Sequence, residues 1–341
     1  MYRHFINMTD NTGMIQFSDK SKPMPESGYT VDDNARALIV AMGMKERERE
    51  RLIKVYSRFM EEAQDSGGVW WNLKINGEFS PVLNSEDCIG RGVLAASFAL
   101  SCDIAEAKNS AVRMLKKALP VASRLTSARA MAYLLLGLVN LINNSYDPAH
   151  LLPKAREMAG RLIDLYEKNR GDGWLWFEDK LTYCNALLPH SLFGFYTISG
   201  DRKALKVARE TLKFLTDSLF RRGYLIIVGN RGWWQKESDI PPFDQQPVDA
   251  ASIVLACLQA YIATGEAEYV EKAQMAYKWY WGKNINGLPL FNEETQGCHD
   301  GLIPEGVNLN QGAEAIISFL MAHQVLNDVM EEKRQVLIPA V

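Results

Sequence analysis

The chain has 341 residues, of which 47% are hydrophobic and 23% charged, so it can bury a large core. Its formal net charge of −3 and pI near 6.0, with Lys and Arg scattered among Asp and Glu, give no basic footprint for nucleic acid. The start MYRHFINMTD lacks the pattern of a signal peptide, and no apolar run reaches membrane-spanning length. Widely spaced cysteines without C-x-x-C indicate reduced thiols. We therefore expect a cytoplasmic protein with no nucleic-acid or membrane partner.

Two kinds of predicted helix alternate along the chain. Apolar helical segments cover 35–44, 90–102, 127–142, 185–198, 249–264 and 312–327, and charged amphipathic segments cover 45–63, 103–125, 148–169, 201–220 and 266–282. The only convincing strand pattern is YLIIV at 224–228. A helix that is apolar all round is buried, whereas one with a charged stripe faces water. The alternation predicts an all-α fold, an (α/α)6 toroid in which an inner ring is wrapped by an outer ring.

The boundaries of this toroid follow from the same pattern. We expect the inner helices near 33–44, 87–101, 127–141, 185–197, 249–263 and 311–326. No Pro- or Ser-rich linker or break in composition divides the chain, which predicts a single domain over 1–341. The final segment EEKRQVLIPAV is short for an outer helix, so we expect imperfect closure there.

Polar and aromatic residues precede five of the six buried helices. The inner helices of such a ring run in one direction, so these segments should converge on one cavity, where long loops carry binding residues. Aromatic rings stack on sugar rings, and carboxylates, amides and Arg bind hydroxyls, so the composition predicts a sugar or oligosaccharide ligand. The candidates are Tyr29, Asp32, Asp33, Trp71, Glu86, Asp87, Arg91, Trp176, Glu178, Asp179, Tyr183, Asn185, His190, Trp234, Asp244, Gln245, Gln246, His299, Asp300, Glu305, Asn310 and Gln311.

Glycosidic bond cleavage needs one protonated and one ionised carboxyl group. The general base is expected at a helix start, where the helix dipole favours the ionised form, and Asp33 and Asp87 fit. The general acid is expected in a drier, indole-rich loop, which indicates Glu178 or Asp179 beside Trp176.

The last long loop supplies two reserve candidates for the catalytic carboxyl groups, Asp300 and Glu305, because loops from opposite sides can flank one bond. Each single residue also has a structural explanation: Asp33 follows Thr30 in a capping-box pattern, and Arg91 can pair with neighbouring acids. Structural roles leave unexplained why such residues recur at one end of five helices. No metal-ligand spacing and no phosphate- or dinucleotide-binding motif appears, so we predict no metal and no cofactor.

The segments that carry these residues also resemble a known family. They are TDNTGMIQFSD, GYTVDDNARALIVA, SEDCIGRGVLA, WFEDKLTYCNALLPHSLF, FDQQPVDAA and GCHDGLIPEGVNLNQGAE. They resemble the helical region found after glycosyltransferase domains, or alone, in many bacteria, which belongs with the six-hairpin glycosidase-like (α/α)6 proteins. The resemblance covers nearly the whole chain. It implies the toroid, a carbohydrate ligand, a bacterial protein, and glycosyltransferases of the same pathway as partners.

Three functions remain open from the sequence. The first is a glycoside hydrolase that uses two carboxyl groups in a central, aromatic-lined cavity. The second is an accessory module that binds carbohydrate without catalysis. The third is a sugar epimerase or isomerase, because some α/α toroids use His as the acid and base.

Overall fold

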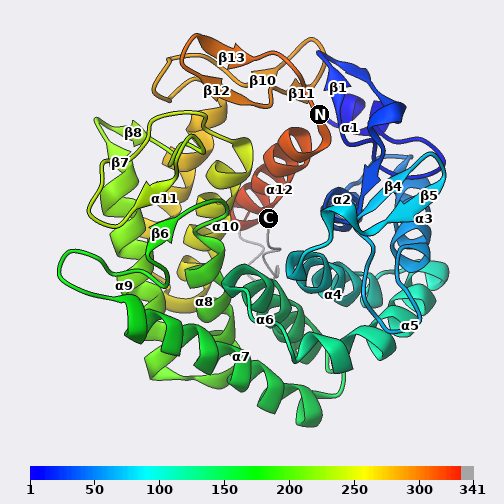
Figure 1. Ribbon diagram of the computed structural model, residues 1–341, viewed down its shortest axis with the longest axis horizontal. Helices are drawn as coiled ribbons and strands as arrows, with labels where there is room; N and C mark the ends of the chain where they lie inside the picture. Colours follow the sequence, from blue (N-terminus) through cyan, green and yellow to red (C-terminus); the bar gives the residue numbers. More distant parts are fainter. Residues whose placement is uncertain (332–341) are drawn as a thin grey trace.

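In the computed structural model, which describes residues 1–331, the helices form two concentric rings (Figure 1). The inner ring comprises α2 (Val31–Met42), α4 (Glu86–Leu100), α6 (Ala128–Asn143), α8 (Leu187–Ser199), α10 (Pro247–Thr264) and α12 (Ala313–Met330). Each inner helix contacts the next, and α12 contacts α2, so the inner ring is closed. The structure confirms the predicted (α/α)6 toroid, and every inner helix begins within two residues of its expected start.

The outer ring consists of helices that are apolar on one side only. They are α3 (Arg49–Glu62), α5 (Ala105–Ala122), α7 (Pro148–Asn169), α9 (Arg202–Leu219) and α11 (Glu268–Tyr277). In α9, Val207, Thr211 and Leu215 are buried at a spacing of four residues, whereas Lys203 and Lys206 are exposed. The buried stripe holds α9 against the inner helix α8, and its charged side remains in water.

The ring closes between its first and last inner helices with help from the N-terminus. The short helix α1 (Arg3–Asn7) packs against α12 and buries Phe5. The Gln324 side-chain amide of α12 donates to the Tyr2 hydroxyl over 2.9 Å, and His4 Nε2 lies 2.7 Å from the Gln311 carbonyl oxygen. The segment in which we expected imperfect closure lies outside the described residues, apart from Glu331.

Short antiparallel strands and 3-10 turns organise the loops. The strands are β1 (Ser18–Asp19) with β2 (Lys22–Pro23); β3 (Tyr29–Thr30), β4 (Leu73–Ile75) and β5 (Glu78–Ser80); β6 (Lys180–Leu181) with β9 (Trp234–Gln235); β7 (Phe220–Arg221) with β8 (Tyr224–Leu225); β10 (Phe291–Asn292) with β11 (Gly297–Cys298); and β12 (Gly301–Ile303) with β13 (Gly306–Asn308). The 3-10 turns are Pro25–Ser27, Pro81–Leu83 and Lys278–Tyr280. The predicted strand 224–228 is thus reduced to the two residues of β8. The pairs β3–β4 and β6–β9 join loops from different helical hairpins, with Leu181 opposite Trp234.

Helix α10 corrects one expectation from the sequence. Among the described residues, Pro247–Thr264 is long and apolar enough to cross a membrane by length and composition, although 78% of it is buried inside the ring. It contacts α8, α11 and α12, so nearly all of its faces meet protein. Packing between these helices accounts for its apolar composition.

Two glycines allow α4 to approach its neighbours closely. A Cβ atom on Gly90 would lie 2.6 Å from the Ala130 carbonyl oxygen of α6, and one on Gly92 would lie 2.7 Å from the Trp70 indole. Contacts this short exclude any larger residue at either position without movement of the neighbours. Arg91, between the two glycines, lines the cavity described next.

Candidate functional site

A cavity of about 560 Å³ lies where α2, α4, α10 and α12 begin. The inner helices thus bring their N-terminal ends, and the loops before them, to one place. Nine of the residues singled out from the sequence line this cavity: Asp32, Asp33, Asp87, Arg91, Tyr183, Asp244, Gln245, Gln246 and Asp300. The N-terminal ends of inner helices therefore supply much of its acidic lining.

The tryptophans that we expected as cavity walls lie elsewhere. Among residues 1–331, no tryptophan lines the cavity, and its aromatic lining consists of Tyr183 and Phe17. Trp234 stacks on Phe214 with ring centroids 5.7 Å apart, and the fully buried Trp176 packs against the same ring at 6.2 Å. These indoles fill the hydrophobic core between the loops and α9, which corrects the expectation of an indole-walled site.

The two leading candidates for the general acid also lie outside the cavity lining. Glu178 pairs with Arg129 Nη1 at 2.9 Å, and the Asp179 side chain is exposed. Arg129 in turn donates from Nε to the Tyr183 carbonyl oxygen over 2.6 Å and lies over the Tyr183 ring at 4.8 Å. Glu178 therefore fixes Arg129, which fixes the position of a ring that does line the cavity.

Most other predicted residues that do not line the cavity brace loops or the core. Glu86 accepts hydrogen bonds from the backbone N–H groups of Thr126 and Ser127, both over 2.6 Å, and so caps the start of α6. The Tyr29 hydroxyl donates to Asp10 over 2.6 Å. The remaining predicted residues outside the lining are Trp71, Asn185, His190, His299, Glu305, Asn310 and Gln311.

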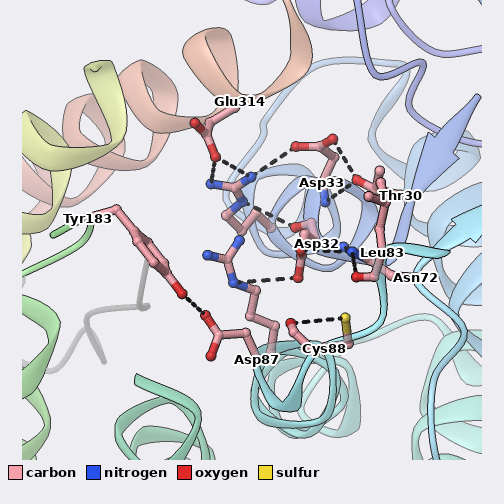
Figure 2. A network of polar contacts seen from close by, with 12 residues as sticks. Thr30, Asp32, Asp33, Asn72, Leu83, Asp87, Cys88, Tyr183 and Glu314 are labelled. Atoms are coloured by element: carbon pink, nitrogen blue, oxygen red, sulfur yellow. Dashed lines mark hydrogen bonds and ion pairs between the residues drawn. The ribbon is translucent and has the colours of Figure 1, made fainter. Parts of the chain in front are cut away.

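A buried network surrounds Asp33 (Figure 2). Its carboxyl group accepts from the Thr30 hydroxyl over 2.6 Å and from Arg36 Nη2 over 2.9 Å, and its backbone N–H donates back to Thr30 over 3.1 Å. Arg36 also donates to Glu314 of α12 over 3.1 Å. Burial raises the pKa of Asp33, and the guanidinium opposes that rise. Both carboxyl oxygens are committed. Thr30 caps α2, and Asp33 holds Arg36, which ties α2 to α12.

The second arginine of the cavity faces Asp32. Arg91 Nε lies 3.6 Å from Asp32 Oδ1, and its guanidinium stacks on the Tyr133 ring at 4.7 Å. Asn72 donates to the other oxygen of Asp32 over 3.1 Å. Arg91 belongs to α4 and Asp32 to α2, so this contact joins adjacent inner helices beside the cavity.

Asp87 and Asp300 are two carboxyl groups of the cavity that form no ion pair with any residue in 1–331. Asp87 accepts from the Tyr183 hydroxyl over 2.8 Å, and its other oxygen has only a 3.5 Å contact with Ser127 Oγ. Asp300 accepts from the Gly312 N–H over 2.6 Å, and burial raises its pKa to about 6. The cavity therefore contains one carboxyl group held by a phenol and another that burial keeps partly protonated near neutral pH.

Neutral hydrogen-bonding groups complete the lining. The side chains of Gln16, Asn230 and Gln246 make no hydrogen bond to any other residue in 1–331, so their amides are available to a ligand. Two thiols near the cavity are poor nucleophiles, because burial raises the pKa of both Cys88 and Cys184 to about 12. Within the described part of the chain, no group of three or more His, Cys, Asp or Glu side chains is arranged to hold a metal ion.

Solved structures share this architecture. A D-mannose isomerase matches with a TM-score of 0.75 at 13% identity, covering 96% of this chain and 94% of that one. The cellobiose 2-epimerase from Bacillus thermoamylovorans matches with a TM-score of 0.71 at 12% identity, covering 96% and 95%. A GH76 α-mannanase from Bacteroides thetaiotaomicron matches with a TM-score of 0.60 at 13% identity, covering 89% and 87%. The chain has the six-hairpin glycosidase-like (α/α)6 fold. Its sequence matches no family model and no curated protein.

Sequence reasoning did not single out several residues that the six-hairpin fold brings to the cavity. Glu314, in the first turn of α12, occupies the same kind of position as Asp33 and Asp87, and the same rule indicates it from the sequence, although it is not among the candidates for a role in the site. Gln16 and Phe17 come from the N-terminal segment, before the first inner helix. No helical periodicity marks such loop residues, and their only signal is that they lie in TDNTGMIQFSD, one of the segments that resemble the family.

Asp249 is a further buried acid close to this site. It lies in the first turn of α10, is 3% exposed, and does not line the cavity. Burial raises its pKa to about 8, and backbone N–H groups of Cys184 and Asn185 oppose that rise. Its protonated form is thus the stable one at neutral pH.

Proposed function

We propose that this protein is a carbohydrate-active enzyme, a glycoside hydrolase in which Asp300 is the general acid and Asp87 is the general base or nucleophile. The observation that carries the proposal is the pairing, in one cavity, of two carboxyl groups with different surroundings. Burial raises the pKa of Asp300 to about 6, as a proton donor requires, and the Tyr183 hydroxyl donates to Asp87 over 2.8 Å.

The chemistry assigned to these residues follows the two-carboxyl mechanism. Asp300 donates its proton to the glycosidic oxygen as the bond to the leaving sugar breaks. Asp87 either removes a proton from water that attacks the anomeric carbon, or attacks that carbon itself. The free amides of Gln16, Asn230 and Gln246 are suited to bind sugar hydroxyls, as expected for a carbohydrate site.

Sugar epimerisation or isomerisation is the second candidate, favoured by the matches to a D-mannose isomerase and a cellobiose 2-epimerase. In the version considered from the sequence, histidines are the acid and base. None of the histidines in residues 1–331 lines the cavity, which supports the carboxyl-based reaction instead. A cytoplasmic location and association with glycosyltransferases of the same pathway remain predictions from the sequence.

A glycan-library screen tests the proposal, with released reducing ends as the readout for hydrolysis and NMR of reducing sugars as the readout for epimerisation. Asp300→Asn and Asp87→Asn should each lower hydrolysis about 10²–10⁴-fold while glycan binding persists, because the amide cannot transfer the proton. Asp217→Asn, on the exposed side of α9, is the matched control and should be fully active. Isomer formation without hydrolysis would favour the second candidate, and binding without either reaction would favour an accessory module.

A further inference from the structure

Arg91 is a buried cation of the cavity whose hydrogen-bond donors are not used. Its side chain is 6% exposed, and none of its guanidinium nitrogens makes a hydrogen bond within residues 1–331. Nε lies 3.6 Å from Asp32 Oδ1, which is too long for a hydrogen bond. The other arginine of the lining, Arg36, donates to the Asp32 carbonyl oxygen, to Asp33 and to Glu314. Buried donors are nearly always satisfied in proteins, so the unused donors of Arg91 indicate a ligand.

Two contacts hold the Arg91 guanidinium in a fixed orientation. It stacks on the ring of Tyr133, which is fully buried in α6, at 4.7 Å. Its Nε faces the Asp32 carboxylate, which Asn72 fixes with a hydrogen bond of 3.1 Å. Of the three nitrogens only Nε is completely shielded from solvent. The two terminal nitrogens therefore face the cavity as a planar fork, which pairs with two neighbouring oxygen atoms.

The cavity is closed at the end where Arg91 lies. The inner-helix residues that line it all come from the first six positions of their helices, and the sixth positions are Arg36 in α2 and Arg91 in α4. Residues one turn further along, such as Val40 and Ala95, are fully buried. Arg91 lies one turn beyond Asp87, about 6 Å along the axis of α4. A sugar chain bound at Asp87 would thus end at Arg91, because it cannot pass through the ring.

The open end of the cavity carries an exposed aromatic ring. Phe17 lines the cavity with 54% of its side chain exposed, and its ring stacks on no other aromatic ring in residues 1–331. Its backbone is held in place, because its N–H donates to Ser27 Oγ over 3.0 Å and its carbonyl oxygen accepts from the Met24 N–H over 3.0 Å. Such a ring beside a polar cavity is suited to the apolar face of a sugar.

From these features we infer that the cavity binds a sugar chain by its end: Arg91 binds two neighbouring oxygen atoms of the terminal sugar, and Phe17 stacks on the next sugar. The oxygen pair belongs to two adjacent hydroxyls or to a carboxylate, since the guanidinium fork fits both. The substrate is then an oligosaccharide or polysaccharide that loses single sugars from one end. The inference rests on the proposed function, because it names the substrate class of the same site.

Binding of sugars of different length tests the two contacts separately. The probes are D-glucose, D-mannose, D-galactose, their 6-carboxylates, and disaccharides and trisaccharides built from them, titrated into Asp300→Asn so that no turnover occurs. Arg91→Lys in that background should weaken every sugar that binds about tenfold or more, whatever its length, because one ammonium group does not replace the fork. Phe17→Ala should weaken disaccharides and trisaccharides about three- to tenfold more than monosaccharides. Whether the neutral sugars or the 6-carboxylates bind identifies the oxygen pair.

The choice of variants separates recognition from misfolding. Arg91→Lys keeps a positive charge beside Asp32. Arg156→Lys, at an exposed arginine of α7, is the matched control and should bind every sugar as its parent does. Melting temperatures check that both variants are folded. Equal affinities of Arg91→Lys and Arg156→Lys would overturn the inference, as would a loss of affinity in Arg91→Lys that is confined to the longer sugars.

Cleavage products distinguish a failure of the inference from a failure of the proposed function. From a hexasaccharide that it cleaves, the wild-type protein should release the monosaccharide from the outset. If disaccharides and trisaccharides appear first, the hydrolase function stands and the inference fails. If the pattern of affinities holds but no glycan is cleaved, the hydrolase proposal fails and recognition of the chain end stands. If no sugar of any length binds, both are contradicted.

Discussion

The proton on Asp300 determines how the proposed reaction should respond to pH. Its pKa of about 6 means that the carboxyl group is protonated below that pH and ionised above it. A general acid must carry its proton when the leaving group departs, so kcat/KM should fall as pH rises through about 6. A pH–rate profile of the wild-type protein measures this limb. The same limb should be absent from the residual activity of Asp300→Asn, and its persistence there would assign the titration to another group.

The Tyr183 hydroxyl should help to hold Asp87 in position for the reaction. Tyr183→Phe removes its hydrogen bond of 2.8 Å to Asp87 while keeping the ring beside Arg129. We expect activity to fall about tenfold, the range of a lost hydrogen bond to a charged group. Tyr29→Phe is the matched control, since its hydroxyl donates to Asp10 outside the cavity lining. Equal activity of both variants would remove Tyr183 from the mechanism.

At the scale of single elements, α4 shows how packing sets the position of a cavity residue. Gly92→Ala would place a methyl group 2.7 Å from the Trp70 indole, so we expect a loss of about 1–3 kcal/mol in the free energy of unfolding. Urea denaturation measures this loss. Gly160→Ala is the control, because Gly160 lies within α7 with no atom within 4 Å of an added Cβ, and there alanine should stabilise the helix slightly.

Helices and loops differed in how well the sequence predicted their contribution to the site. Asp33 and Asp87 lie in the first turns of inner helices, and helix geometry carries both to the cavity. Asp179 and Glu305 lie in loops, where no repeat fixes the direction of a side chain, and neither reaches it. A tryptophan in a loop can pack in the hydrophobic core as well as in the wall of a cavity, and Trp234 packs in the core, where it stacks on Phe214 of α9. Composition alone does not distinguish a core tryptophan from one that lines a cavity.

For the molecule as a whole, the inner helices were predictable because they are apolar on every face, a property that few exposed helices share.

The burial of acidic side chains within the ring should make the stability of the protein depend on pH. Asp249 has a pKa of about 8 in the folded protein, above the usual value of an unfolded aspartate. Between about pH 4 and pH 8 the unfolded chain releases this proton and the folded protein keeps it, so stability should fall as pH rises and then level off.

Thermal unfolding at pH 5 and pH 8 measures that dependence. The melting temperature of Asp249→Asn should change less between the two pH values than that of the wild type, because an amide does not titrate. Asp217→Asn, an exposed acid of α9, should keep the wild-type dependence. If the melting temperature of Asp249→Asn depends on pH as strongly as that of the wild type, the dependence comes from other buried acids, such as Asp33.

The contact between the two ends of the described chain bears on how the protein is made. A ribosome delivers α1 and α2 first and α12 last, yet α1 packs against α12, and α2 adjoins it in the closed ring. Until synthesis reaches α12, the nascent chain exposes apolar surfaces of α2 and α10 that the finished protein covers. The ring can therefore close only after α12 has been synthesised, and until then chaperones that bind apolar helices can reach this seam.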